Sequence, residues 1–317
     1  MYDVAALGEL LIDFTCLSTD TDGYPTMAAH PGGAPANYLA ALTKFGAKTA
    51  MIGKVGNDAF GRLLIKTLKG TGIDTRGMLV SDDVFTTLAF VTLDDSGNRE
   101  FSFARKPGAD TQLRFDEIDL GVIDASKVLH FGTLSMTNEP ARDATYKAVE
   151  YAAGRGKLIS FDPNLRKPLW NDLDEAKRQM LWGLRHADVV KISDEETEFL
   201  FSLAPEESAK HIINSFGVRL VYVTCGAEGC FYRTKTASGF VKALSGIAVK
   251  DTTGAGDIFG GSAMYGLLRA GGVPEKLTAE ELENIVSFAC ASAGLSTTRA
   301  GGISSCLLYT SDAADEL

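Results

Sequence analysis

Short apolar runs alternate along the chain with longer segments in which apolar residues recur every three or four positions. The short runs predict buried strands, and the three-to-four spacing predicts amphipathic helices. Strands are predicted at residues 4–7, 48–52, 127–131, 157–162, 188–192 and 219–224. Helices are predicted at residues 35–45, 59–68, 140–155, 172–185, 206–216, 258–268 and 279–295. This alternation predicts an α/β fold with a mainly parallel sheet that is covered by helices on both faces.

A second, smaller group of strands interrupts this alternation in the first third of the chain. Residues 86–93 and 100–104 are β-type runs, and Asp94–Asn98 between them is a hairpin signal. Residues 15–31 are polar and rich in turn formers. We expect these segments to form a small sheet that stands off the main body.

Composition excludes some classes of partner. The 317 residues carry 45% hydrophobic and 23% charged side chains, with a net charge of −10. This balance is ordinary for a soluble globular protein, and its acidity disfavours nucleic acid and anionic membranes as partners. The five cysteines are odd in number and show no C-x-x-C spacing, which favours a reducing, cytoplasmic location. The N-terminus has no signal-peptide pattern, and the sequence has no apolar run of membrane-spanning length.

The strongest chemical signal is a glycine-rich turn that opens the helix predicted at 258–268. Gly254 and Gly256 let the backbone approach a ligand closely. A turn of this kind presents unpaired N–H groups at a helix start and so forms an anion site. Asp257 would repel a bound phosphate, and the role that explains it best is a general base that accepts a proton from a hydroxyl. The competing interpretation is an acidic first-turn residue that only favours the helix dipole.

A second glycine pair opens the helix predicted at 35–45. Gly32 and Gly33 precede Pro35, whose missing N–H is harmless in the first turn of a helix. Asn37 is expected to face any ligand for which the two glycines leave room. A capping asparagine is the alternative for Asn37. Asp13 lies beyond the first predicted strand, at the kind of strand end where α/β proteins bind ligands. It could accept hydrogen bonds from two sugar hydroxyls, or it could be a solvated loop residue.

Taken together, these strings resemble the signatures of the ribokinase-like (PfkB-type) carbohydrate kinases. Asp-Thr-Thr-Gly-Ala-Gly-Asp at 251–257 resembles the C-terminal signature, and Pro-Gly-Gly-Ala-Pro-Ala-Asn at 31–37 resembles the N-terminal one. The resemblance implies a three-layer α/β/α sandwich with a small β lid near 14–31 and 85–106. It implies that Asp257 is the catalytic base, that Gly254, Ala255 and Gly256 form the anion hole, and that Asp13, Gly32, Gly33 and Asn37 contact a sugar.

Further strings favour the fructokinase branch of that family. Asp-Pro-Asn-Leu-Arg at 162–166 resembles the fructokinase and 2-keto-3-deoxygluconate kinase branches, with Asn164 toward the sugar and Arg166 suited to bidentate phosphate contact. Phe-Ser-Phe-Ala-Arg ends at Arg105, which could reach a sugar oxygen from above or could be a surface residue. The implied reaction transfers the γ-phosphoryl group of ATP to D-fructose, at the 6-hydroxyl by family analogy. Ketodeoxygluconate kinase and a catalytically silent sugar- or nucleotide-binding regulator are the alternatives.

The resemblance also implies residues for the nucleotide and for cations. Lys191, Thr224, Gly226 and Gly229 match positions on the nucleotide side. Glu196 matches a residue that organises Mg²⁺ through water, but Ser193 stands where many members have asparagine, and Ser193 with Glu196 also has the spacing of a helix capping box. Asp251 and Thr253 match positions that hold a monovalent cation such as K⁺ in many relatives.

The resemblance covers residues 2 to about 305, which predicts one kinase domain at 1–305. Residues 306–317 break the pattern, and we expect this tail to be foreign to the fold. Lid sheets in this family often pair, so a homodimer through the lid is a further expectation.

Overall fold

The main sheet of the computed structural model, which describes residues 1–93 and 99–306, has nine strands among those residues. They are β1 (Tyr2–Leu7), β4 (Thr49–Gly56), β5 (Asp74–Ser81), β8 (Ser126–Gly132), β9 (Leu158–Asp162), β10 (Val189–Ser193), β11 (Leu220–Thr224), β12 (Gly229–Arg233) and β13 (Ser238–Lys242). Their order is β13-β12-β11-β10-β9-β8-β1-β4-β5. The strands from β11 to β5 in this order all run parallel to their neighbours. Strand β12 runs antiparallel to β11, and β13 runs antiparallel to β12. The predicted mainly parallel sheet is confirmed.

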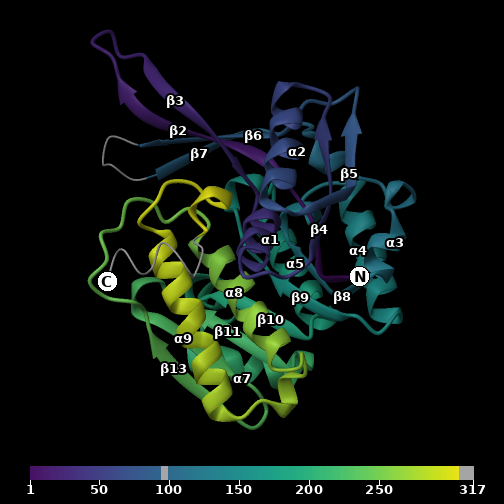
Figure 1. Ribbon diagram of the computed structural model, residues 1–317, viewed down its shortest axis with the longest axis vertical. Coiled ribbons are helices and arrows are strands. Elements are labelled where there is room, and N and C mark those ends of the chain that lie inside the picture. Colours follow the sequence, from purple (N-terminus) through teal and green to yellow (C-terminus); the bar gives the residue numbers. More distant parts are fainter. Residues whose placement is uncertain (94–98, 307–317) are drawn as a thin grey trace.

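Helices cover both faces of this sheet, as the alternation of strands and helices predicts (Figure 1). One face carries α1 (Ala34–Lys44), α2 (Ala59–Thr71), α8 (Ala255–Arg269) and α9 (Ala279–Ser296). The other carries α3 (Leu120–Asp124), α4 (Ala141–Gly154), α5 (Leu173–His186), α6 (Asp194–Phe201) and α7 (Pro205–Phe216). The architecture is therefore a three-layer sandwich.

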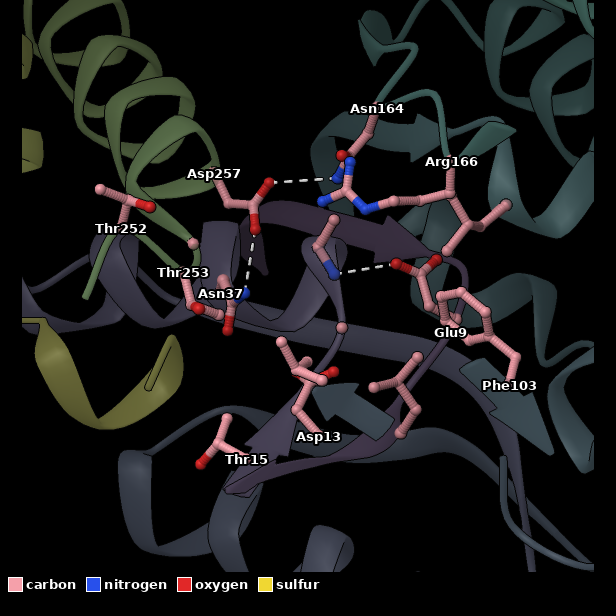
Figure 2. A pocket seen from close by; sticks show the side chains of 16 residues that line it. Glu9, Asp13, Thr15, Asn37, Phe103, Asn164, Arg166, Thr252, Thr253 and Asp257 are labelled. Carbon is pink, nitrogen blue, oxygen red and sulfur yellow. Dashed lines mark hydrogen bonds between the residues drawn. The ribbon is translucent and has the colours of Figure 1, made fainter. Parts of the chain in front are cut away.

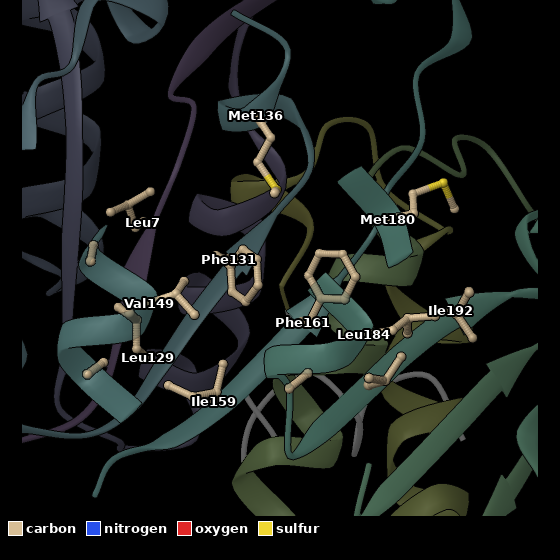
Figure 3. Packing of buried hydrophobic residues seen from close by; sticks show 14 of the residues in the cluster. Leu7, Leu129, Phe131, Met136, Val149, Ile159, Phe161, Met180, Leu184 and Ile192 are labelled. Carbon is tan, nitrogen blue, oxygen red and sulfur yellow. The ribbon is translucent and has the colours of Figure 1, made fainter. Parts of the chain in front are cut away.

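Each face of the sheet packs its own apolar core. Along β1, Ala5 and Leu7 belong to the core beneath α4 and α5, whereas Val4 and Ala6 belong to the core beneath α1 and α8. This division follows from the period of two along a strand, and it explains why strands buried on both faces appear as continuous apolar runs. Figure 3 shows the first of these cores, in which the rings of Phe131 and Phe161 stack at 4.7 Å between centroids.

A separate sheet of four strands projects from the body (Figure 1). It consists of β2 (Leu11–Thr19), β3 (Pro25–Gly32), β6 (Leu88–Leu93) and β7 (Arg99–Ala104), in the order β3-β2-β6-β7. Phe14 on β2 anchors it, with ring centroids 5.2 Å from Phe90 and 5.6 Å from Phe60 of α2. The predicted small sheet is therefore present, while the hairpin signal at residues 94–98 lies outside the described residues.

Three local predictions differ from the structure. Strand β5 has no counterpart in the apolar pattern, because its side chains are mostly half-exposed at the edge of the sheet. Strand β4 continues to Gly56 instead of ending near residue 52, and Asp58 alone caps α2 through the N–H groups of Phe60 and Gly61. The apolar spacing of the helix predicted at 59–68 places Leu63 on the inward face with Leu64 and Leu68, but Leu63 is 39% exposed because α2 buries only a narrow stripe.

The described part of the chain ends in a packed segment. Cys306, the first residue of the predicted foreign tail, is buried in the core beneath α1 and α8. Residues 307–317 lie outside the described residues, so the assignment of that tail remains a prediction. Of the helices in residues 1–93 and 99–306, none combines the length and apolar character that crossing a bilayer requires.

Candidate active site

The start of α8 forms a turn at the carboxyl-end edge of the main sheet. Gly254 precedes the helix with a φ of 76°, in the left-handed region that favours glycine. The Ala255 N–H donates to the Thr252 carbonyl at 3.2 Å. The N–H groups of Gly256 and Asp257 have no acceptor within the helix, and Gly254 has no side chain that could cap them. Together with the helix dipole, these N–H groups form a site suited to an anion.

Two asparagines hold the carboxylate of Asp257 (Figure 2). Asn37 Nδ2, from α1, donates to Oδ2 at 2.9 Å, and Asn164 Nδ2, from the loop after β9, donates to Oδ1 at 3.3 Å. Asp257 is 8% exposed. Burial raises its pKa, whereas the positive charges of Lys191 and Arg166 and the hydrogen bond from Asn37 oppose this rise. The side-chain amides of Asn37 and Asn164, here called the amide clamp, keep the carboxylate oriented and available as a proton acceptor.

A buried ion pair lies beneath the α8 turn. Lys191 Nζ on β10 lies 3.1 Å from Asp162 Oδ2 at the end of β9. An ideal Cβ on Gly256 would lie 2.9 Å from Lys191 Nζ, so the ammonium sits directly against the first turn of α8. Burial disfavours its charge, but the carboxylates of Asp162, Glu196 and Asp257 raise the pKa of Lys191 above its ordinary value. The turn therefore has a fixed positive charge on its sheet side.

A polar cavity of about 260 Å³ lies between the small sheet and α8. It is lined by Glu9, Leu11, Asp13, Thr15, Gly33, Ala34, Asn37, Val91, Phe103, Leu134, Asn164, Arg166, Thr252, Thr253, Gly254 and Asp257 (Figure 2). Three carboxylates and one guanidinium are the charged groups of this lining. The cavity is therefore net negative and rich in hydrogen-bonding groups, as a polyhydroxylated neutral ligand requires.

Asp13 projects into the polar cavity from β2, not from a loop after β1 as the sequence suggested. Gly32 on the neighbouring strand β3, where it pairs with Leu11, makes room for it, because a Cβ there would lie 2.2 Å from Asp13 Oδ2. Burial raises the pKa of Asp13 to about 7, although the Arg166 guanidinium opposes the shift. The carboxyl group thus titrates near neutral pH.

Glu9 is a residue of this cavity that the sequence analysis missed. It is 3% exposed, and its Oε1 accepts the Ala34 N–H at 2.8 Å at the start of α1. Burial raises the pKa of Glu9 to about 7. Its position after β1, at the carboxyl end of a buried strand, was the signal that could have identified it. Thr15 and Leu134 gave no comparable signal, whereas Phe103 and Thr252 lie within the strings at 101–105 and 251–257.

A second, apolar cavity of about 490 Å³ lies on the other side of the α8 turn. It is lined by Thr224, Gly226, Ala227, Gly229, residues 243–247, Val249, Thr252, Ala255, Gly256, Phe259, Cys290, Ala293, Gly294 and Thr297. Thr252 lines both cavities, and Gly254 and Asp257 line the polar one beside Ala255 and Gly256 of the apolar one. The first turn of α8 therefore separates the two spaces and faces both.

The structure divides the predicted nucleotide residues into two groups. Thr224, Gly226 and Gly229 all line the apolar cavity. Gly229 has a φ of 131° and a backbone so close to Val241 that a Cβ would lie 2.0 Å from its carbonyl oxygen. Lys191 lies outside this lining and contacts the α8 turn from the strand side.

Arg105 is placed differently from the prediction. It is 6% exposed and lies outside the lining of the polar cavity. Its Nη2 donates to Asp110 at 2.7 Å and to the Leu134 carbonyl at 2.8 Å, and its Nη1 donates to Thr137 at 2.7 Å. The expected contact with a sugar oxygen is therefore corrected: the guanidinium is committed to protein acceptors and supports Leu134 in the cavity wall.

The predicted metal residues are likewise bound within the protein. Glu196 accepts the N–H groups of Leu165 at 2.7 Å and Ser193 at 2.9 Å, which establishes the capping box of α6. Asp251 accepts the N–H groups of Thr253 and Gly301, both at 2.9 Å. Within residues 1–93 and 99–306, no three His, Cys, Asp or Glu side chains gather as a metal site. Glu196 for Mg²⁺ and Asp251 with Thr253 for a monovalent cation were expected as two separate sites, and both assignments stay predictions.

Nearly the whole chain is similar to known sugar kinases. The family model described as pfkB family carbohydrate kinase matches residues 1–308. Probable fructokinase-3 of Arabidopsis thaliana is 40% identical over 304 residues, which are 95% of this chain and 87% of that protein. The fructokinase of Xylella fastidiosa with bound ATP superposes with a TM-score of 0.88 at 29% identity, over 96% of this chain and 95% of that one.

A further similar solved structure holds both a sugar and a nucleotide. It is a double mutant of the fructokinase of Vibrio cholerae O395 in its fructose-, ADP- and potassium-bound form. It superposes with a TM-score of 0.84 at 31% identity, over 96% of this chain and 95% of that one.

Proposed function

The chain belongs to the PfkB family of carbohydrate kinases, and from that premise we propose that it is a fructokinase. It would transfer the γ-phosphoryl group of ATP to a hydroxyl of D-fructose, and fructose 6-phosphate is the expected product. Three relatives support this substrate pair: a curated one named as a probable fructokinase, and solved fructokinases that hold ATP in one case and fructose with ADP in the other.

The observation that carries the proposal is the position of Asp257 at the boundary of the two cavities. Asp257 lines the polar cavity, while Ala255 and Gly256 of the same helix turn line the apolar one. A sugar in the polar cavity and a nucleotide in the apolar one would bring hydroxyl and γ-phosphate together at this turn. Such positioning is the main contribution that a protein makes to phosphoryl transfer.

In this mechanism, Asp257 accepts the proton of the attacking hydroxyl while the sugar oxygen forms a bond to the γ-phosphorus. The bond from that phosphorus to the bridging oxygen breaks, and ADP leaves with the electron pair. The N–H groups of Gly256 and Asp257 stabilise the charge that develops on the phosphoryl oxygens. Asn37 and Asn164 keep the carboxylate in place, and both also border the sugar, as Asp13 and Gly33 do.

Positive charge near the transferring group comes from two side chains. Arg166 reaches into the polar cavity near Asp257 (Figure 2), and Lys191 supports the α8 turn from below. Mg²⁺ bound with ATP would supply further charge neutralisation, and we propose that the phosphates and water hold most of its coordination sphere. For K⁺, the loop that includes Asp251 and Thr253 stays a prediction, supported by the potassium-bound relative.

The charge of the polar cavity favours a neutral sugar. Above pH 7, where the carboxyl groups of Glu9 and Asp13 are ionised, three carboxylates including Asp257 oppose a single guanidinium, Arg166, so a ligand with its own carboxylate would meet net repulsion. This argues for fructose over 2-keto-3-deoxygluconate. We also propose a cytoplasmic location, because all five cysteines are free thiols, as expected in a reducing compartment.

A sugar panel with ATP and Mg²⁺ tests the proposal. Fructose, 2-keto-3-deoxygluconate, ribose and glucose would be compared at equal concentration by ADP release, and the product of fructose would be identified with an enzyme specific for fructose 6-phosphate. We expect fructose to have the highest kcat/KM, by up to roughly 10⁴-fold over sugars that lack the required hydroxyls.

The alternatives give different results in the same panel. A higher kcat/KM for 2-keto-3-deoxygluconate would replace the fructokinase assignment and keep the mechanism. Sugar-induced stabilisation without ADP release from any sugar would indicate a silent binding protein instead.

A further inference from the structure

The side chains around the apolar cavity are mostly apolar and carry few hydrogen-bonding groups. The cavity's larger apolar side chains are Leu244, Ile247, Val249, Phe259 and Cys290, beside alanines and glycines. None of the described residues that line it carries a carboxylate, an amide, an imidazole, an ammonium or a guanidinium group. Adenine and guanine differ only in groups that donate or accept hydrogen bonds, and such side chains are the usual means of telling them apart.

Three of the four hydroxyl groups in this lining are engaged or lie near the phosphate side, and the fourth, on Ser245, belongs to an exposed residue of the rim. The Thr297 hydroxyl donates to the Gly294 carbonyl at 2.7 Å, and the Thr224 hydroxyl faces the Ile192 carbonyl at 3.4 Å. Thr252 borders both cavities and so lies beside the transferring phosphate. The base would therefore meet mainly aliphatic surface.

The rim of the cavity is apolar and exposed. Leu244 is 40% exposed and Val249 is 59% exposed, both on the segment that follows β13. Gly294 on α9 lets this segment approach, because a Cβ there would lie 3.1 Å from the Leu244 Cβ and 3.3 Å from the Ile247 Cδ1. In Figure 1, β13 and α9 lie side by side at this end of the molecule. Flat aromatic bases of any kind could cover these side chains.

We propose that the donor site accepts a nucleobase by shape and apolar contact, so that GTP and ITP serve as phosphoryl donors alongside ATP. The inference rests on the proposed function, because the sugar acceptor and the α8 turn are the same. With each donor, the bond from the γ-phosphorus to its bridging oxygen breaks, a bond to the sugar oxygen forms, and the nucleoside diphosphate leaves. Apolar pockets discriminate between similar ligands by about 10–200-fold, whereas sites with dedicated polar groups reach about 10⁴–10⁵-fold.

Donor kinetics at saturating fructose provide the first test. We expect the kcat/KM values for GTP and ITP to lie within about 100-fold of the value for ATP. If either donor is less efficient than ATP by more than about 10³-fold, the proposal is overturned. ITP is included because it lacks the 2-amino group of guanine and so reports the effect of the 6-oxo group alone.

Binding of ADP, GDP and IDP, measured by calorimetry without sugar, keeps the test independent of turnover. Dissociation constants within about 100-fold of one another support the inference even if no sugar is phosphorylated, in which case only the proposed function fails. A preference for ADP above about 10³-fold overturns it whatever the activity.

A matched pair of variants tests the role of the apolar rim. Leu244→Ala should weaken ADP and GDP by the same factor, about 3–10-fold, because it removes contact area that any base would cover. Phe240→Ala is the control, since Phe240 is 47% exposed on β13 but lies outside the lining of the cavity. A change of more than tenfold in the ratio of ADP to GDP affinity in Leu244→Ala would show base-specific recognition and contradict the proposal.

Discussion

At the scale of single residues, Asp257 combines the properties that a general base needs. It is buried, it borders the polar cavity, and both of its oxygens accept amide N–H groups. A residue that served only the helix dipole would need none of these features, because such acids act from exposed first turns. The contacts therefore favour the catalytic interpretation over the structural one.

Replacement of Asp257 by asparagine distinguishes the two interpretations. Asp257→Asn keeps the shape and removes the proton acceptor, so kcat should fall by about 10²–10⁴-fold. ADP binding should hold or tighten, because a negative charge beside the phosphates is lost. A folded variant that keeps more than about a tenth of wild-type kcat would contradict the base assignment. The structural interpretation predicts intact kcat and a stability change of about 0.3–1 kcal/mol.

Asp13 gives a prediction about pH. Burial raises the pKa of Asp13 to about 7 in the folded state. Between pH 4 and 7 the folded protein therefore binds more protons at this residue than the unfolded chain does. As a result, the contribution of Asp13 to the free energy of unfolding falls as the pH rises through that window. Asp13→Asn removes the buried charge and should raise the free energy of unfolding at pH 8 by about 1–4 kcal/mol, with no gain near pH 4.

Urea unfolding at several pH values measures this effect. The control is Asp22→Asn, since Asp22 is exposed on the same sheet's hairpin turn and should change stability at neither pH. Equal stability of wild type and Asp13→Asn at pH 8 would show that the carboxyl group is well solvated. In the same variant, kcat/KM for fructose should fall, because a sugar hydroxyl loses its carboxylate acceptor.

At the scale of elements, the loop between α9 and Cys306 packs against the segment before α8 and against Asn37. The Gly301 N–H donates to Asp251 at 2.9 Å, and the Thr297 carbonyl accepts the N–H groups of Lys250 and Asp251. Gly302 packs against the amide of Asn37, where a Cβ would lie 2.2 Å from Oδ1. The loop thus fixes both the segment before α8 and the asparagine that orients Asp257.

Gly302→Ala tests this arrangement. The φ of Gly302 is −89°, which alanine adopts readily, so the variant acts through the contact with Asn37 and not through backbone strain. Displacement of the Asn37 amide should lower kcat by about 10–100-fold. Gly70→Ala on α2 is the control, because no atom lies within 4 Å of a Cβ there and activity should be unchanged. Wild-type kcat in Gly302→Ala would show that the amide clamp is dispensable.

At the scale of the whole molecule, the small sheet both completes the polar cavity and presents apolar surface. Val91 and Phe103 contribute to the cavity wall from β6 and β7. On the β2–β3 hairpin, Leu17 is 66% exposed and Tyr24 is 70% exposed. Exposed apolar side chains on a projecting sheet are typical of an association surface.

Pairing of two copies through this sheet remains a prediction, and sedimentation velocity can test it. We expect the wild type to be dimeric. The Leu17→Asp variant should be monomeric, and its monomer should still be folded. Leu173→Asp is the control, because Leu173 is 42% exposed on α5, on the main body. A monomeric wild type, or a dimer that Leu17→Asp leaves intact, would place any interface elsewhere.

The sequence by itself determined the features that depend on neighbours along the chain. The periodicity of apolar residues predicts the main strands and most helices, because burial on both faces of a sheet leaves a local pattern. The glycines at 32, 33, 254 and 256 likewise mark the turns that open α1 and α8, since only a few residue types adopt those turns. The family and the fold class follow from these local strings.

Only the tertiary structure decided which side chains share a partner. Asn37 and Asp257 are 220 positions apart, and their contact depends on how α1 and α8 pack. Arg105 lies beside Asp110 and Leu134, so its donors are satisfied within the protein and do not reach the cavity. Glu196 accepts the N–H groups of Leu165 and Ser193, the second of them within the capping box of α6. A side chain binds the nearest complementary group in space, and spacing along the chain does not specify that group.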